Sequence, residues 1–208
     1  MKRRFFLGAA GATSVTALLL PPSGPQSTAG RPAPSAGGRF PNVPLITHRG
    51  DNVRFYDDVI RGNKINIINM MYTQCPDVCG GTLVNMARAQ ALFGERMGRD
   101  VFMYSISLDP SHDTPDVLAQ HARHLHAGPH WTFLTGEPAH IEQLRRALNY
   151  VDADPVVDRD LTAHTGMVRA GNDALDRWVA CPGYAPARQL AQSALWVGLA
   201  SAAVQQEA

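Results

Sequence analysis

Short apolar runs alternate with amphipathic stretches over most of this chain. The β-branched and apolar run at 64–72 predicts a buried central strand, and Val101–Leu108 and Trp131–Thr135 predict two more. Each run is followed by apolar residues at helical spacing. Strands that alternate with helices favour right-handed crossovers onto one sheet, so the pattern predicts an α/β fold with a central sheet flanked by helices.

The helices between these strands have recognisable starts. Thr114 is expected to cap the second helix with Pro115 at its first position, and Glu137-Pro138 opens the third. The first is expected to end at Gly98. The expected apolar faces comprise Thr82, Leu83, Met86, Ala89, Leu92 and Phe93 in the first helix, Leu118 and Leu125 in the second, and Ile141, Leu144 and Leu148 in the third.

Both ends of the sheet are expected to carry a hairpin, because clusters of turn-forming residues separate short runs of strand formers. A polar stretch, Asp152–Thr165, is expected to form an exposed loop before the second hairpin. A final helix is expected from Pro186 to about Val204. The hairpin strands are expected at 45–47 and 53–56, and at 166–169 and 175–179.

The N-terminus has the composition of an export signal. Lys2-Arg3-Arg4 precedes an uncharged stretch, Phe5–Leu20, and Arg3-Arg4-Phe5-Phe6-Leu7 is similar to the twin-arginine type. We therefore expect a signal peptide over 1–29, a flexible spacer over 30–39 and a single domain over 40–208. Location in the periplasm or outside the cell follows, with an uncleaved anchor in the inner membrane as the alternative.

Composition and charge indicate a globular protein and argue against a nucleic-acid-binding one. A content of 45% hydrophobic and 18% charged residues indicates a globular chain, and 208 residues suffice for one α/β domain with extensions. Cleavage after residue 29 would remove three of the 19 basic residues and none of the 18 acidic ones, which leaves a net charge of −2. That balance argues against nucleic-acid binding by bulk charge.

Two cysteines, Cys75 and Cys79, lie four residues apart where the first strand gives way to the first helix. Their spacing suits a soft metal ion, a reversible disulfide or two core thiols. Pro76 fits the first helical position, and a thiol at a helix N-terminus has a lowered pKa, which favours the thiolate. Cys181 is the odd third cysteine and is expected to be a buried bystander.

Two thiolates can hold copper(I), and an imidazole often completes such a site. His121, His124, His126 and His130 cluster near one helix end, where a solvated helix end is the simpler interpretation. His164 differs because it directly precedes a strand of the late hairpin, at the end of the polar loop.

Four segments in order resemble the Sco/SenC family, the copper chaperones of cytochrome c oxidase assembly, from about Ile46 to Val197. They are Tyr72-Thr73-Gln74-Cys75-Pro76-Asp77-Val78-Cys79; Ser105-Ile106-Ser107-Leu108-Asp109-Pro110 with Asp113-Thr114-Pro115; Phe133-Leu134-Thr135-Gly136; and His164-Thr165-Gly166.

The resemblance implies a thioredoxin-like fold with an added N-terminal hairpin and a late inserted hairpin. It also implies that one copper ion, Cu(I) or Cu(II), is bound by Cys75, Cys79 and His164. The chain departs from the family pattern at Gly80, where Pro is frequent, and at Ala163, where an Asp often precedes the His. Without that Asp, a carboxylate that fixes the imidazole tautomer is missing.

The function implied is an exported metallochaperone that delivers copper to the oxidase subunit with the dinuclear copper site. Other periplasmic copper carriers and thiol reductants are further candidate partners. One alternative is a thiol-disulfide oxidoreductase in which Cys75 attacks and Cys79 resolves, keeping the cysteines of that subunit reduced. The other is a copper- or redox-responsive signalling protein.

Overall fold

The structure is a computed structural model that describes residues 39–75, 78–160 and 166–199, with only the backbone at Val78 and Cys79. The predicted signal peptide and nearly all of the predicted spacer lie outside the described residues. Among the residues described, no helix has the length and apolarity needed to cross a membrane.

Seven strands and five α-helices make up the described chain, together with a π-helical turn (η1) and a 3-10 turn (η2). In order they are β1 (Pro44–Thr47), β2 (Asn52–Arg54), η1 (Phe55–Ile60), β3 (Ile65–Met71), α1 (Val78–Phe93), η2 (Gly94–Arg96), β4 (Val101–Ser107), α2 (Pro115–His124), β5 (Trp131–Thr135), α3 (Pro138–Ala147), α4 (Pro155–Arg159), β6 (Met167–Asn172), β7 (Arg177–Pro182) and α5 (Ala187–Trp196).

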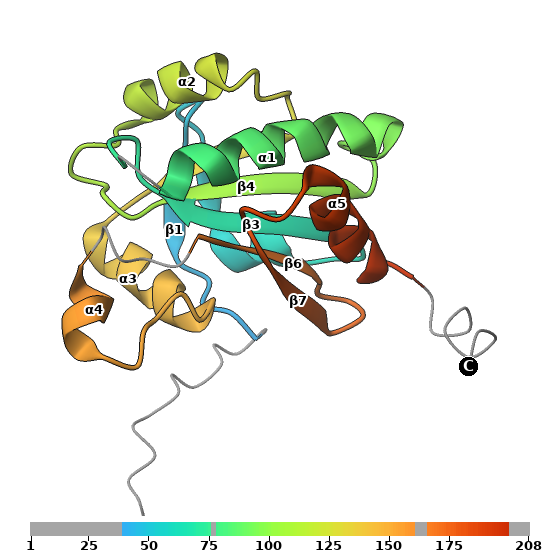
Figure 1. Cartoon of the computed structure of the whole chain (residues 1–208). Coiled ribbons are helices and arrows are strands. Elements are labelled where there is room, and N and C mark those ends of the chain that lie inside the picture. Colours follow the sequence, from blue (N-terminus) through green and yellow to red (C-terminus); the bar gives the residue numbers. More distant parts are fainter. Residues whose placement is uncertain (1–38, 76–77, 161–165, 200–208) are drawn as a thin grey trace, which may run out of the picture. The chain divides into compact units, whose positions relative to one another are not determined.

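One sheet runs through the molecule in the strand order β2-β1-β5-β4-β3-β6-β7 (Figure 1). Its centre, β5-β4-β3, is parallel, as the alternation of strands and helices predicts. The two predicted hairpins pair antiparallel with the edges of this centre, β1 with β5 and β6 with β3. The α/β fold class with flanking helices and two added hairpins is therefore confirmed.

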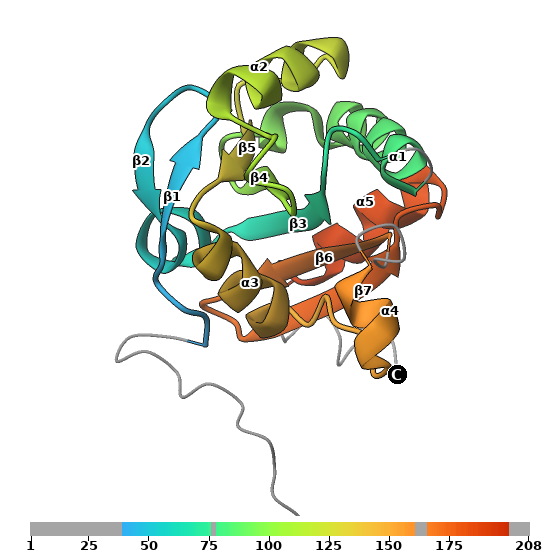
Figure 2. The same ribbon diagram turned by 90° about the vertical axis from the view of Figure 1, so that its left-hand side faces the viewer.

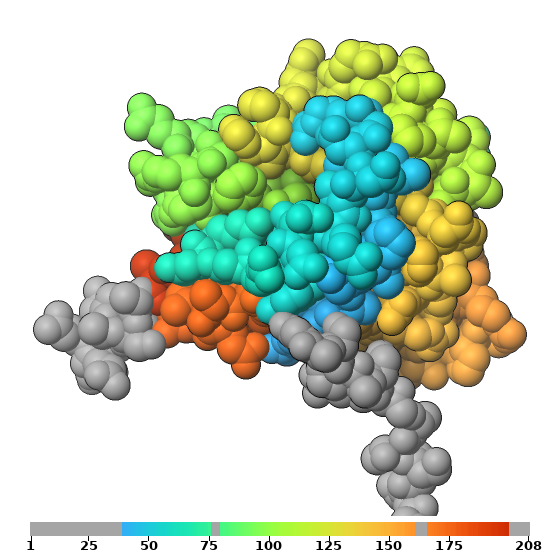
Figure 3. Space-filling model, turned by 180° about the vertical axis from the view of Figure 1, so that it is seen from behind, coloured from blue at the N-terminus to red at the C-terminus, as the bar shows by residue number. Residues whose placement is uncertain are grey.

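Alternating side chains of the strands divide the core into two layers. On one face, β3 contributes Ile67 and Met71 to a cluster with side chains from α1, α2 and α5. On the other, Ile68 and Met70 pack with η1 and α3. Figure 2 shows α3 on the side of the sheet opposite α1 and α2. Seen from behind in Figure 3, the N-terminal hairpin and the segment after it, blue to cyan, lie at the surface beside α3.

The two asparagines in the buried strand β3 are accommodated by hydrogen bonds. Asn66 Nδ2 donates to the carbonyl of Ile60, 2.9 Å away. Asn69 Oδ1 accepts from the Ser105 hydroxyl at 2.7 Å, and that hydroxyl in turn accepts from the indole N–H of Trp131 at 2.9 Å. Three neighbouring strands are thus joined by a buried polar chain, which explains polar residues that break the strand's apolar pattern.

Several element ends differ from prediction. The second strand of the first hairpin stops at Arg54 rather than at position 56, because Asn42 Oδ1 accepts from the N–H groups of Tyr56 and Asp57 and so favours the π-helical turn. Helix α1 ends at Phe93 instead of Gly98, since Gly94 adopts a positive φ of 53°.

Two further differences concern the second half. The predicted loop Asp152–Thr165 contains the short helix α4, whose N-cap Asp154 accepts from the Val156 N–H at 2.8 Å. Helix α5 ends at Trp196, before the predicted Val204, and Gly198 follows in close approach to the side chain of Ile65. The late hairpin is confirmed, but β7 begins two residues after the predicted start.

Candidate functional site

The cysteine motif lies at the carboxyl end of the central strand β3. Three residues lead from Met71 through a turn to Cys75, whose N–H donates to the carbonyl of Tyr72 at 3.2 Å. The Cys75 side chain is half-buried and packs against the core cluster shared by α1 and α5. Cys79 lies in the first turn of α1, and its side chain is outside the described part of the structure. Ligands bind at this edge of open α/β sheets.

A buried carboxylate in the loop between β4 and α2 braces this turn. Asp113 is fully buried and accepts from both the N–H and the hydroxyl of Thr73, at 3.2 and 2.5 Å. It also accepts from the Ser107 hydroxyl, the last residue of β4, at 2.6 Å. Because Thr73 is two residues before Cys75, this carboxylate ties the cysteine turn to the end of β4 and the start of α2.

The same carboxylate influences a histidine on α2. Burial lowers the pKa of His121, with the nearby charge of Asp113 acting in the opposite direction and His124 adding to the lowering. The His121 ring packs edge-on against Phe133, with ring centroids 6.1 Å apart. His121 is therefore a half-buried packing residue that is more often neutral than a histidine in water.

The other histidines of this cluster are exposed. His124, His126 and His130 lie at or beyond the C-terminal end of α2 and face solvent, as the solvated helix end predicts. Within the described residues, no three His, Cys, Asp or Glu side chains come together as a metal site. Two of the predicted ligands stand apart from this statement, because the side chain of Cys79 and the whole of His164 lie outside the described residues.

His164 lies outside the described residues, but the structure describes both of its flanks. On one flank, Gly166 accepts a hydrogen bond from the Gly183 N–H at 2.6 Å. A Cβ on Gly183 would stand 2.5 Å from the Gly166 carbonyl and equally close to a methyl of Thr82 in α1. Position 166 is therefore held beside Thr82 of α1, three residues after Cys79.

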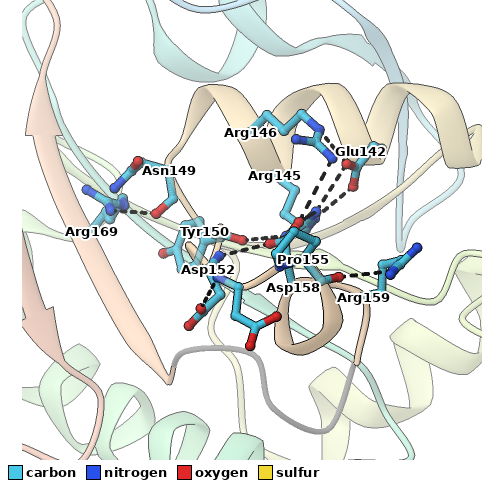
Figure 4. A network of polar contacts seen from close by, with 11 residues as sticks. Glu142, Arg145, Arg146, Asn149, Tyr150, Asp152, Pro155, Asp158, Arg159 and Arg169 are labelled. Carbon is cyan, nitrogen blue, oxygen red and sulfur yellow. Dashed lines mark hydrogen bonds and ion pairs between the residues drawn. The ribbon is translucent and has the colours of Figure 1, made fainter. Parts of the chain in front are cut away.

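On the other flank, α4 is fastened to α3 by a charged network (Figure 4). The Arg145 guanidinium donates to both oxygens of Asp158, at 2.6 and 2.8 Å, and to Glu142. Both side chains of the Arg145–Asp158 pair are only 11% exposed. The hydrogen bonds from Arg145 hold the pKa of Asp158 well below its ordinary value.

Cys181 lies on β7 and is 6% exposed, so its predicted burial is confirmed. It belongs to the same core cluster that Cys75 borders.

Three residues of this region carry no signal that marks them in the sequence. Asp113 belongs to a segment that resembles the family, but nothing in the sequence assigns it a role, and its contact with Thr73 spans 40 residues. Gly183 and Tyr184 follow β7 and reach α1 only through the folding of the late hairpin. Turn residues of this kind are too common for composition to single them out.

Comparison with known proteins gives this site a context. The chain is 30% identical over 146 residues to "Protein SCO1 homolog 1, mitochondrial" of Arabidopsis thaliana, a match that covers 67% of this chain and 43% of that protein. The chain thus spans less than half the length of that relative.

Two solved structures share the fold. Bradyrhizobium japonicum ScoI with copper bound is 26% identical, with a TM-score of 0.58, and the match covers 76% of this chain and 99% of that one. BsSco, described as "a member of the Sco family of cytochrome c oxidase assembly proteins", is 18% identical with a TM-score of 0.59, over 76% of this chain and 94% of that one. The thioredoxin-like fold of Sco proteins is therefore confirmed for this chain.

The sequence pattern of one family covers both the cysteine turn and the late hairpin's first strand. Residues 31–173, more than two thirds of the chain, match the model of the SCO1/SenC family. With the motif at the end of β3 and the added hairpins in place, the chain belongs to the SCO1/SenC family.

Proposed function

We propose that this protein is an exported copper carrier that binds one copper ion through Cys75, Cys79 and His164. It delivers that ion to the dinuclear copper site of cytochrome c oxidase. Support comes from its membership of the SCO1/SenC family and from the copper held by ScoI of B. japonicum. BsSco belongs to a family of cytochrome c oxidase assembly proteins, which suggests the oxidase as the receiver.

The observation that carries the proposal is the position of the cysteine turn. Cys75 ends a turn that Asp113 braces, and α1 begins three residues later, at Val78. A helix N-terminus lowers the pKa of nearby thiols and so favours the thiolate form that binds metal. Two thiolates suit a soft ion such as copper(I), and an added imidazole suits copper(II) as well.

Transfer by ligand exchange follows from this ligand set. The ion passes through a state in which it is bound by thiolates of both proteins, so the carrier must expose its site to the receiver. The half-burial of Cys75 is compatible with such access.

The test is an anaerobic copper titration of the reduced protein, with absorption and electron paramagnetic resonance spectra. The wild type is expected to bind one copper ion. Cys75→Ala is expected to abolish binding, and His164→Ala to change the copper(II) spectrum. Cys181→Ala is the matched control and should bind as the wild type does. Loss of binding in the control, or none in the wild type, would refute the assignment.

A second candidate uses the same pair of cysteines as a thiol-disulfide oxidoreductase. The observation that favours it is again a thiol pair at the start of a helix, where a thiolate is stabilised. Reduction of the receiver's disulfide needs no imidazole. Full reductase activity in His164→Ala, combined with lost copper transfer in the same variant, would show that both activities exist and that His164 separates them.

Export is a separate part of the proposal. Replacement of Arg3 and Arg4 by lysine is expected to retain the precursor inside the cell if the twin-arginine pathway exports it. Cell fractionation measures this, and unchanged export would contradict that route.

A further inference from the structure

An exposed aromatic side chain lies directly beside the cysteine motif. Tyr184, in the turn between β7 and α5, is 58% exposed. Its ring nevertheless rests on Gly81 in the first turn of α1, where a Cβ would stand 2.5 Å from the ring carbon Cε1. Only glycine at position 81 permits this approach, two residues after Cys79.

The backbone that carries Tyr184 is held firmly against α1. The Asn85 side-chain amide donates to the carbonyl of Gly183 at 2.9 Å, and the Gly183 N–H is bonded to Gly166. One helical turn beyond Gly81, Val84 is 43% exposed and extends the apolar surface. An aromatic ring that is exposed, but whose position is already fixed, costs little conformational entropy when a partner covers it.

The two helices around this ring carry charge of one sign only. α1 and α5 lie side by side over the same face of the sheet (Figures 1 and 2). The only charged residue in α1 is Arg88, and the only one in α5 is Arg188. Both are exposed, and neither forms an ion pair within the described chain.

Copper transfer dictates what must cover this surface. When one ion is bound by thiolates of two proteins, their surfaces must be in contact around the cysteines, because metal–sulfur bonds are only about 2.3 Å long. Among the side chains that the structure describes there, Val84 in α1 and Tyr184 in the neighbouring turn are the large apolar ones that are exposed. A receiver with carboxylates would complement the two arginines.

We propose that the face formed by α1 and α5, centred on Tyr184 and bordered by Arg88 and Arg188, is the docking surface for the copper-receiving protein. The receiver presents an apolar patch edged by carboxylates. This inference rests on the proposed function, since it identifies the surface through which that same site is reached.

The experiment measures docking without copper and transfer with copper. The probe is the purified apo form of the soluble copper-binding domain of the oxidase subunit from the same organism. Calorimetry gives the association constant of the two apo proteins at low and at physiological salt, and stopped-flow absorption gives the transfer rate. Tyr184→Ala is expected to lower both by about tenfold or more, as removal of an interface aromatic does. Its copper affinity should stay at the wild-type value.

Leu92→Ala is the matched control. Leu92 is 54% exposed at the far end of the same helix, about 12 Å beyond Val84 by the helical rise. Its association constant and transfer rate should remain those of the wild type. The double variant Arg88→Glu/Arg188→Glu is expected to slow association about tenfold and to flatten its dependence on salt, whereas Arg123→Glu on α2 should do neither.

Four outcomes decide the question. If the Tyr184→Ala variant docks and transfers copper as well as the wild type, the docking surface is overturned, even if the chain binds copper. A wild type that binds no copper would refute the proposed function, while a Tyr184-dependent association of the apo proteins would still support the surface. Tyr184→Ala that only dissociates a homodimer, or only weakens binding to lipid vesicles, would assign the face to a second copy or a membrane and overturn the proposal.

Discussion

Replacement of Asp113 by asparagine tests whether a buried carboxylate holds the cysteine turn. The substitution preserves the shape of the side chain but removes its charge and replaces one acceptor oxygen by an N–H₂ donor. In the wild type, the two carboxylate oxygens accept hydrogen bonds from the hydroxyls of Thr73 and Ser107, at 2.5 and 2.6 Å. They also accept one from the Thr73 N–H.

The expected loss of stability follows from these bonds. A hydrogen bond to a charged group contributes about 1.5–3 kcal/mol and one between neutral groups about 1 kcal/mol. Two short bonds weakened in this way cost about 2 kcal/mol in the free energy of unfolding. Asp113→Ala leaves three donors without an acceptor in the protein interior and is expected to cost about 4 kcal/mol.

The functional effect is expected at Cys75. A turn released from Asp113 samples more conformations. Copper binding must then restrict the turn to one conformation, and the conformational entropy lost in doing so lowers the affinity. We expect Asp113→Asn to lower copper affinity about tenfold, the lower end of the effects seen when residues that orient metal ligands are replaced.

Urea denaturation gives the change in stability, and competition with a copper(I) chelator gives the change in affinity. Asp116→Asn is the control, because Asp116 is exposed in the first turn of α2 and its loss should cost no more than about 0.5 kcal/mol. If Asp113→Asn were as stable as this control and bound copper as tightly as the wild type, the brace would have no energetic role.

Two other changes test the flanks of His164. Asp158→Asn is expected to cost about 2 kcal/mol near neutral pH, because it removes the more buried of the two acidic partners of the largely buried Arg145. Since the folded protein lowers the pKa of Asp158, its stabilisation is present above the ordinary value of 3.8 and is lost as the pH falls below it; the difference from wild type in urea denaturation should shrink there. If the variant and the wild type differed in stability by the same amount at neutral pH and below pH 3.8, the ion pair would not be the cause. Gly183→Ala is expected to cost about 2 kcal/mol, because its Cβ would overlap Thr82 and a backbone carbonyl, and to alter the copper(II) spectrum. Gly80→Ala, which meets open space in α1, should be neutral or slightly stabilising by thermal denaturation, and equal effects of both alanines would argue against the steric explanation.

Local pattern was a reliable guide where neighbours in sequence decide the structure. Trp131–Thr135 forms a strand with the predicted bounds, and Thr114 caps α2 by accepting from the Val117 N–H. Predictions were wrong at Tyr56 and at the end of the last helix, which stops at Trp196; the predicted end, Val204, lies outside the described residues. At the first, Asn42, 14 residues earlier, supplies the hydrogen bond that starts a turn. At the second, the helix ends where Gly198 meets Ile65, and no periodicity of the segment itself contains that contact.

The candidate site divides in the same way. The residue types and spacing of Cys75 and Cys79 are readable from the chain, because two thiols at a strand-to-helix turn restrict the chemistry to soft metals, redox exchange or core packing. His164 stood out by its position directly before the late hairpin, but its role as a copper ligand was implied only by resemblance to a family, and it lies outside the described residues. Only the folded protein showed how Asp113 and Gly183 contact the segments beside these predicted ligands.

The sequence by itself therefore determined the alternation of strands and helices, the two added hairpins and the cysteine turn, since each depends on periodicities and turn residues within a few positions. Only the tertiary structure decided which distant residues meet that turn. Asp113 reaches it because β3 and β4 are parallel neighbours whose carboxyl ends lie at one edge. Tyr184 reaches it because the late hairpin pairs with β3 and returns the chain to α1. Such contacts depend on the closure of long loops and on packing, which no local pattern encodes.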